Sequence, residues 1–239
     1  MKQENEQQQQ QTFAMSALFE RKRRLTIAHP AADIAKVLDN VCRLIVESRG
    51  GQYQPMEEIG RIARWLEKPH RHGLLLLGNV GSGKTTIARA IREVINHLDI
   101  GRFTDNKGLM IAKGWIAYGK MKNESTNWMN EVSAVNLCRV VESDKFDKAK
   151  ECAALMIDDI GSEPEIVKVY GNEQSPVAEL IDWRNDHQLF TIATSNLSTR
   201  TSLGVNQFLE RYGDRTASRI AELFDVIIIK GQDHRKGDK

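Results

Sequence analysis

Residues 74–86 of this 239-residue chain read Leu-Leu-Leu-Leu-Gly-Asn-Val-Gly-Ser-Gly-Lys-Thr-Thr. An apolar run between glycines is typical of a strand that is buried on both faces of a parallel sheet. The residues that follow carry an apolar stripe from Ile87 to Leu98 at the spacing of an amphipathic helix. Strand, glycine-rich turn and helix in this order predict a phosphate-binding loop, because the pattern G-x-x-x-x-G-K-[ST] stands at the turn.

Each residue type in this loop has a chemical reason. The glycines let the backbone curl so that successive N–H groups point at one anion, and the start of a helix adds unpaired N–H groups and a positive dipole end. We expect Lys84 to reach the β- and γ-phosphates, Thr85 to bind Mg²⁺, and Thr86 to help at the α-phosphate. The predicted nucleotide-binding residues of the loop are Gly78, Asn79, Val80, Gly81, Ser82, Gly83, Lys84, Thr85 and Thr86.

Two carboxylates end a second apolar run, which predicts the metal end of the same site. Asp158 and Asp159 follow Leu155-Met156-Ile157. We expect Asp158 to hold Mg²⁺ through its water shell and Asp159 to orient or deprotonate the attacking water. Glu163 is a reserve base, or else a solvated acid of the loop. The alternative for both aspartates is a simple turn or helix cap.

A third apolar run ends in polar residues, Thr194-Ser195-Asn196. Ligands of open parallel sheets lie beyond the carboxyl ends of the strands, so these residues should face the same crevice. Asn196 can donate to the γ-phosphate or hold the water. Its alternative is an ordinary asparagine at the start of a loop.

Together these features resemble a P-loop ATPase of the AAA+ class, in particular the DnaC-type helicase loaders and the IstB-like ATPases that assist transposition. The resemblance covers about residues 55–239. It rests on the phosphate loop and on three further motifs, Ile157-Asp158-Asp159-Ile160-Gly161, Thr194-Ser195-Asn196-Leu197 and Tyr212-Gly213-Asp214-Arg215-Thr216-Ala217-Ser218-Arg219-Ile220.

The resemblance implies an α/β fold, a three-layer αβα P-loop NTPase with a five-stranded, mostly parallel sheet and the phosphate-loop strand in its middle. It implies ATP and Mg²⁺ as cofactors, assembly into homo-oligomers, binding of single-stranded DNA, and a replicative helicase or a transposase as partner. It makes Asn196 the first sensor, Arg219 an arginine finger that reaches a neighbouring subunit, Arg215 the second arginine of that motif, and Arg235 a second sensor. The alternative for each arginine is a surface salt bridge.

The pattern along the chain predicts its organisation. The Gln-rich residues 1–30 form a disordered or partly helical tail, residues 31–54 a helical lead-in, and residues 55–239 the ATPase core. Apolar runs at 109–112, 154–157, 190–193 and 226–229 predict the further strands, with helices between most of them. Residues 114–152 are expected to hold a helix, a polar loop and another helix.

Composition bears on the partners and the cellular compartment of the chain. The net charge of +2 neither requires nor excludes a nucleic-acid partner. A candidate contact for single-stranded DNA interleaves aromatic and basic residues; the alternative is that its aromatics belong to the core. Its members are Lys113, Trp115, Tyr118, Lys120 and Lys122. The three cysteines form no C-x-x-C and favour a reducing cytoplasm, and no apolar run is long enough to span a membrane.

Three functions remain open for this chain. The first is an ATPase that hydrolyses ATP across a subunit boundary and remodels a DNA complex. The second is a binding module that uses ATP as a switch with negligible turnover, because an aspartate at position 159 has a short reach. The third, a small-molecule kinase, gives the Ser218-Arg219 region no role and is the weakest.

Overall fold

The structure of the chain is a computed structural model. It describes residues 24–27, 29–97, 101–104, 110–111, 129–152, 154–169, 172–199 and 204–231. Its elements in chain order are β1 Arg24–Ile27, α2 Ala31–Glu47, α3 Ile59–Glu67, β2 Gly73–Leu77, α4 Lys84–His97, β3 Gly101–Thr104, β4 Met110–Ile111, β5 Met129–Ser133, α5 Ala134–Arg139, α6 Asp144–Glu151, β6 Ala154–Ile160, β7 Val167–Val169, β8 Asn172–Gln174, α7 Pro176–Asp186, β9 Phe190–Ser195, α8 Gln207–Leu223 and β10 Phe224–Ile228.

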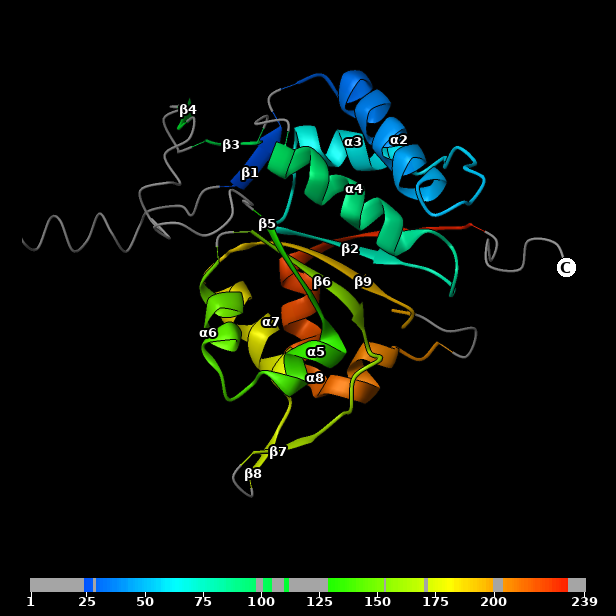
Figure 1. Cartoon of the computed structure of the whole chain (residues 1–239). Coiled ribbons are helices and arrows are strands. Elements are labelled where there is room, and N and C mark those ends of the chain that lie inside the picture. The colour runs from blue at the N-terminus through cyan, green and yellow to red at the C-terminus, as the bar shows by residue number, and fades with distance from the viewer. Residues whose placement is uncertain are drawn as a thin grey trace, which may run out of the picture.

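A five-stranded parallel sheet in the order β10-β2-β9-β6-β5 forms the middle layer. Helices α2, α3 and α4 cover one face of the sheet, and α5 to α8 cover the other (Figure 1). The predicted fold class, a three-layer αβα P-loop NTPase, is therefore confirmed. One detail of that expectation is corrected, because the phosphate-loop strand β2 lies beside the edge strand β10 and the central strand is β9.

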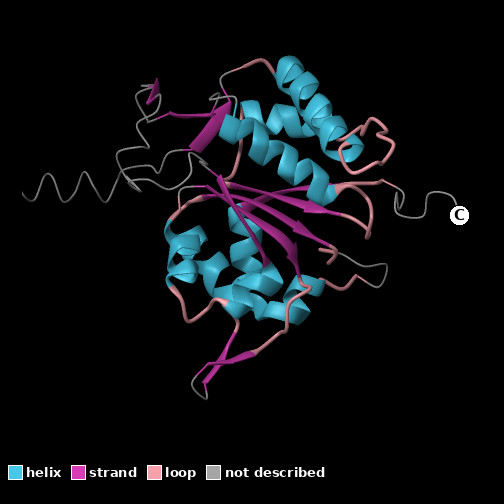
Figure 2. Ribbon diagram, in the orientation of Figure 1, coloured by secondary structure: helices cyan, strands magenta, loops and turns pink. Residues whose placement is uncertain are grey.

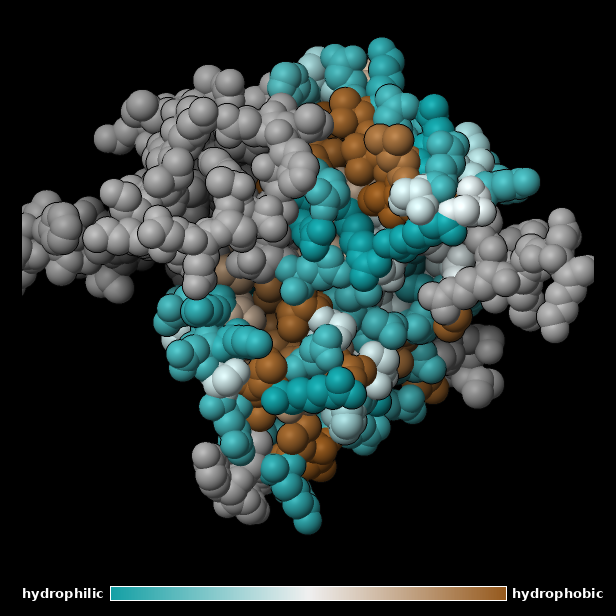
Figure 3. Space-filling model, in the orientation of Figure 1, coloured by the Kyte–Doolittle hydropathy of each residue, from teal (hydrophilic) through white to brown (hydrophobic). Residues whose placement is uncertain are grey.

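The alternation of side chains along each strand builds two separate cores. Leu74 and Leu76 point to the α2–α4 face, whereas Leu75 and Leu77 point to the α5–α8 face, and all four are buried. Successive residues of a strand face opposite sides, so an unbroken apolar run supplies both cores at once. In the space-filling view, hydrophobic side chains emerge over both helical layers (Figure 3).

The strand expected next in the sequence after β2 does not belong to the parallel sheet. The expected run at 109–112 contributes only β4, which belongs to a small antiparallel sheet with β3 and β1. The parallel sheet instead uses β5, a polar strand whose Glu131 accepts hydrogen bonds from Arg89 and Arg92 on α4. Residues 134–151 hold the short helices α5 and α6, and β7 and β8 form a hairpin that projects from the α5–α8 side (Figure 2).

A buried arginine ties α7 to the end of α6. Arg184 is fully buried and donates to the backbone oxygens of Ala149, Cys152 and Phe190 at 2.7–2.9 Å. The last carbonyls of a helix lack partners within it, so a guanidinium placed there satisfies them and meets the negative end of the helix dipole. Burial lowers the pKa of this guanidinium from its ordinary value.

Candidate nucleotide-binding site

The phosphate loop lies between the carboxyl end of β2 and the first turn of α4. Gly81 and Gly83 have φ of +80° and +93°, a left-handed conformation that costs glycine little and other residues much more. The loop therefore curls over the start of α4, whose N–H groups point toward the space that it encloses. This is the geometry that the sequence pattern predicts for an anion-binding loop.

Lys84 lies in the mouth of this loop and is 6% exposed. Its Nζ donates to the backbone oxygens of Gly78 and Asn79 at 2.8 and 2.7 Å. The same ammonium donates to Oδ1 of Asn196 at 2.8 Å, although the two residues are far apart in the sequence. The phosphate loop and the end of β9 thus share one charged group.

The metal end of the site is built by two hydroxyls around one carboxylate oxygen. Thr85 on α4 donates its hydroxyl to Oδ1 of Asp158 at 2.8 Å. Thr194 on β9 donates to the same oxygen at 2.7 Å. Helix α4 and strand β9 therefore both orient the side chain of Asp158 on β6.

Asp159 owes its position to an irregularity of β6. The pairing of β6 with β9 shifts register between Ile157 and Ile160, and Asp159 has a φ of +62°. Bulges of this kind turn a side chain away from its regular direction, and a left-handed conformation at a residue other than glycine stores strain. The N–H of Asp159 donates to Thr194 Oγ1 at 2.8 Å, which holds the turned backbone in place.

Asn196 bridges the cationic and anionic parts of the site. Its Oδ1 accepts from Lys84, while its Nδ2 donates to Oδ1 of Asp159 at 2.8 Å. One amide therefore sets the distance between the ammonium and the second carboxylate. Lys84, Asp158, Asp159 and Asn196 lie in one connected network, as the sequence predicts for a single crevice at the carboxyl ends of the strands.

The residues of the loop suit a magnesium–nucleotide ligand. The hydroxyl of Thr85 and the carboxylate of Asp158 are oxygen donors of the kind that Mg²⁺ takes, while it keeps most of its waters. The Ser82 hydroxyl oxygen is buried in the loop without a hydrogen-bond partner among the described residues. The described residues contain no cluster of three acidic, histidine or cysteine side chains suited to a metal.

The chain after β10 closes over the phosphate loop. The N–H of Ile229 continues the pairing to Leu77 at 2.7 Å, and the N–H of Lys230 donates to Glu58 Oε1 at 2.9 Å. The Met56 sulfur lies against Gly83, where a β-carbon would approach it to 3.1 Å. The residues before α3 and after β10 therefore border the loop. Arg235 lies outside the described residues.

Glu163 is not the solvated loop acid of the alternative interpretation. Its residue is 4% exposed, and its carboxylate accepts from the N–H of Gly161 at 2.8 Å and from the hydroxyl of Tyr212. Burial and the nearby Glu163 raise the pKa of Tyr212, so the phenol remains a donor. Glu163 therefore connects the loop after β6 to α8, a role that requires long-range contacts and gives no local signal in the sequence.

The two arginines of the α8 motif lie away from the phosphate loop. Gly213 interrupts α8 with a φ of +75°, and both arginines follow this kink. Arg219 pairs with Asp186 at 3.1 Å and Glu222 at 3.2 Å, and Arg215 pairs with Asp182 at 3.3 Å. The ion pairs given as the alternative for these two arginines are therefore present within the chain, and neither arginine joins the network around Lys84.

Other predicted residues fall differently. Asn79 and Val80 are exposed on the loop, and Thr86 is half-buried at the start of α4. The candidate DNA contact at Lys113, Trp115, Tyr118, Lys120 and Lys122 lies outside the described residues. Thr194, to which sequence reasoning gave no role, contacts both aspartates. Its signal was its place as a polar residue at the end of an apolar strand.

Searches for similar proteins found no matching family model and no matching curated protein. Among solved structures, the chain is similar to the DnaC helicase loader at 20% identity and a TM-score of 0.48, over 74% of this chain and 94% of that one. It is similar to DnaI at 22% identity and a TM-score of 0.44, over 73% and 84%. AMPPCP-bound DnaA from Aquifex aeolicus matches at 17% identity and a TM-score of 0.39, over 80% and 44%.

Within the described ranges, no helix combines the length and the apolar character that crossing a membrane requires.

Proposed function

We propose that this chain is an ATPase of the AAA+ class, which binds ATP with Mg²⁺ and hydrolyses it to ADP and phosphate. The observation that carries the proposal is the network of Lys84, Asp158, Asp159 and Asn196 beside the phosphate loop. A loop that only turned the chain would not require a lysine, two carboxylates and an amide from three different elements to converge on its mouth.

The proposed roles follow from the contacts. Lys84, which lies near the loop carbonyls, would exchange them for the β- and γ-phosphate oxygens. Thr85 and Asp158 would hold Mg²⁺, which neutralises charge that develops on the phosphates. Asn196 would contact the γ-phosphate while it keeps Asp159 directed toward the attacking water.

We assign Arg219 to a neighbouring copy of the chain. In this chain it pairs with Asp186 and Glu222 instead of joining the Lys84 network. A guanidinium can stabilise the charge of a transferring phosphoryl group only when it touches that group, so a catalytic Arg219 would act on the site of another subunit. Arg215, which follows the same kink, would support that contact, and Arg235 would serve as the second sensor.

The motifs favour a role in DNA replication of the DnaC helicase-loader type, with a replicative helicase and single-stranded DNA as partners. The IstB-like role in transposition is the alternative within the same class. A second candidate function, an ATP switch with negligible turnover, is favoured by the short side chain of Asp159, which already accepts from Asn196.

Phosphate release by the full chain tests the proposal. We expect Mg²⁺-dependent release of phosphate from ATP whose rate per subunit rises with protein concentration, because a site completed by Arg219 of a second copy forms only in an oligomer. ATP binding without phosphate release would instead support the switch. A rate per subunit that is independent of concentration would contradict the assignment of Arg219, and absence of ATP binding would contradict the proposal as a whole.

A further inference from the structure

The outer edge of β10 presents unpaired backbone groups. Among the described strands, β10 pairs only with β2 and lies at the end of the sheet order. Because the N–H of Ile229 points to Leu77, the backbone groups of Val226 and Ile228, which alternate with it, point away from the sheet. No partner for them is found within the described ranges, whereas the outward N–H of Lys230 is already bound to Glu58.

A basic groove lies on one side of this edge. Arg61 and Arg64 lie three residues apart on one face of α3, and Lys68 and His70 follow the end of the helix. With Trp65 and residues 225–227 they line a groove of about 440 Å³. The edge of β10 therefore forms one wall of a channel whose other wall carries positive charge.

Among the described residues, no carboxylate forms an ion pair with Arg61, Arg64 or Lys68. Asp225, the acidic residue of its lining, accepts from the Trp65 indole at 2.7 Å and from the N–H of Arg71 at 3.0 Å, and it pairs with the Arg71 guanidinium at 3.5 Å. Glu57 and Glu67 are exposed nearby in the sequence. Where the structure describes the chain, neither of them forms an ion pair with the α3 cations.

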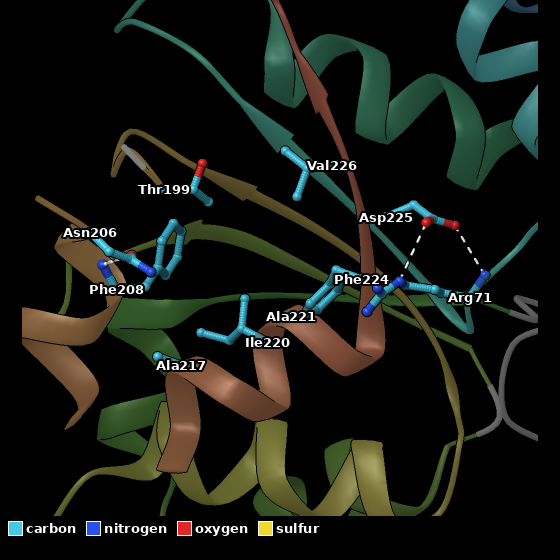
Figure 4. A pocket seen from close by; sticks show the side chains of 10 residues that line it. All are labelled: Arg71, Thr199, Asn206, Phe208, Ala217, Ile220, Ala221, Phe224, Asp225 and Val226. Carbon is cyan, nitrogen blue, oxygen red and sulfur yellow. Dashed lines mark hydrogen bonds and ion pairs between the residues drawn. The ribbon is translucent and has the colours of Figure 1, made fainter. Parts of the chain in front are cut away.

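A groove with one apolar wall, the apolar groove, lies on the other side of the same edge. It has a volume of about 280 Å³. Phe208, Ile220, Phe224 and Val226 form the apolar wall between β10 and α8, and Arg71, Thr199, Asn206 and Asp225 also line the groove (Figure 4). Helix α8 ends directly at the start of β10, so it covers only the first residues of the strand. Val226 and Ile228 consequently remain 38% and 53% exposed.

We propose that the outer edge of β10 binds an extended segment of a partner protein, a segment in which acidic and apolar side chains alternate. Such a segment would pair with the backbone groups of Val226 and Ile228 and add a sixth strand to the five-stranded sheet. Side chains of a strand alternate between its two faces, so acidic ones would meet Arg61, Arg64 and Lys68 while apolar ones enter the groove beside α8.

The same observations argue against a nucleic acid as the occupant. Bases of a single strand stack on exposed aromatic rings, but Trp65 in the basic groove is 6% exposed and its indole N–H is held by Asp225. A phosphate backbone would also leave the outward N–H groups of β10 and the apolar groove without use. A peptide of alternating acidic and apolar residues contacts the basic groove, the outward N–H groups of β10 and the apolar groove.

Fluorescence anisotropy with the full chain, in the absence of nucleotide, tests this. The probe is a fluorescein-labelled peptide of four Glu-Val repeats. We expect it to bind, a peptide of four Lys-Val repeats to bind at least tenfold more weakly, and a Glu-Val peptide that is N-methylated at every residue to lose binding, because this removes all hydrogen-bond donors of the added strand whichever way it runs. Equal binding of the Glu-Val and Lys-Val peptides, or of the N-methylated peptide, would overturn the proposal.

Two variants locate the contact. The double substitution Arg61→Glu and Arg64→Glu should weaken binding at least tenfold, whereas Lys145→Glu with Lys148→Glu, the same charge change on the exposed α6, should not. Val226→Pro removes one outward N–H without removing a bond to β2 and should also weaken binding at least tenfold. Thermal melting confirms that each variant folds.

The N-methylated peptide keeps the inference falsifiable should Val226→Pro fail to fold. Binding of a thymidine 20-mer that depends on Arg61 and Arg64, together with no binding of the Glu-Val peptide, would assign the groove to nucleic acid and overturn the inference. Since no nucleotide enters this experiment, its failure leaves the proposed ATPase untouched, and a chain without ATPase activity can still bind the peptide.

Discussion

Charged side chains at the phosphate-loop end of the sheet differ from those on the α7–α8 face in their burial and in the strength of their contacts. At the loop, Lys84 is buried and connected to Asp159 through Asn196. On the α7–α8 face, Arg219 forms ion pairs with carboxylates that are about half exposed or more, and the Arg215 side chain is 77% exposed. The first set is held in one arrangement, while the second can leave its partners at small cost.

This difference suggests how one chain can carry both halves of a composite site. Groups that bind a phosphate must be oriented before it arrives. The residues at the loop meet this condition, because they are hydrogen-bonded to one another around the buried Lys84. A group that serves another subunit must be accessible, so it rests in weak surface ion pairs. We therefore expect substitutions at the phosphate loop to weaken ATP binding, and substitutions on the α7–α8 face to slow ATP hydrolysis.

The largest effect is the loss of ATP affinity that we expect when Lys84 is replaced. Lys84→Ala removes the ammonium that joins the phosphate loop to Asn196, and we expect ATP affinity to fall at least about 100-fold, as expected for lost charge-assisted hydrogen bonds to phosphate. Isothermal titration with ATP and Mg²⁺ measures this. Lys148→Ala, an exposed lysine of α6, serves as the control. Retention of tight ATP binding by Lys84→Ala would contradict the site.

Substitution of Arg219 on the α7–α8 face should slow ATP hydrolysis without changing ATP affinity. Arg219→Ala is expected to bind ATP with unchanged affinity and to hydrolyse it about 10³-fold more slowly, the lower limit for an arginine finger. Mixing this variant with Lys84→Ala provides the decisive control, because hybrid interfaces then combine an intact loop with an intact Arg219. Part of the turnover should return; if the mixture stays inactive while the variants still assemble, the action across subunits is wrong.

A substitution of Asp159 tests the catalytic end of the network around Lys84. Asp159→Asn keeps the size of the side chain but cannot accept a proton, so we expect hydrolysis to fall about 10²-fold or more while ATP binding and ATP-dependent assembly persist. Phosphate release and size-exclusion chromatography with ATP follow the two properties. Normal turnover would exclude Asp159 as the base, and buried Glu163 would be a poor replacement for it.

The smallest effect is the change that we expect in the free energy of unfolding of Arg219→Ala. Exposed ion pairs contribute little to folding, so Arg219→Ala should change the free energy of unfolding by less than about 1 kcal/mol. Arg184→Met, in contrast, leaves buried carbonyls of α6 and β9 without a donor and should cost about 3 kcal/mol or more. Urea denaturation compares the two. A large loss in Arg219→Ala would mean that its ion pairs are structural.

Much of the fold could be predicted because the buried strands carry unbroken apolar runs. β2, β6 and β9 have neighbours on both sides; β2 and β6 appear in the sequence as such runs, and β9 as a run interrupted by Thr191. Strand β5 could not be found in this way, since it lies at the edge and presents Glu131 to two arginines of α4. The apolar run at 109–112 was misleading because its residues supply a strand of a different sheet.

Within the site, the sequence by itself determined the phosphate loop, because glycines at fixed spacing and a following helix set that geometry locally. It also indicated Asp158, Asp159 and Asn196, since polar residues at the carboxyl ends of parallel strands share one edge. Only the tertiary structure decided that Asn196 joins Lys84 to Asp159 and that Glu163 is buried against Tyr212. It alone revealed the open edge of β10. Those outcomes depend on contacts between residues distant in the chain, and local spacing carries no information about them.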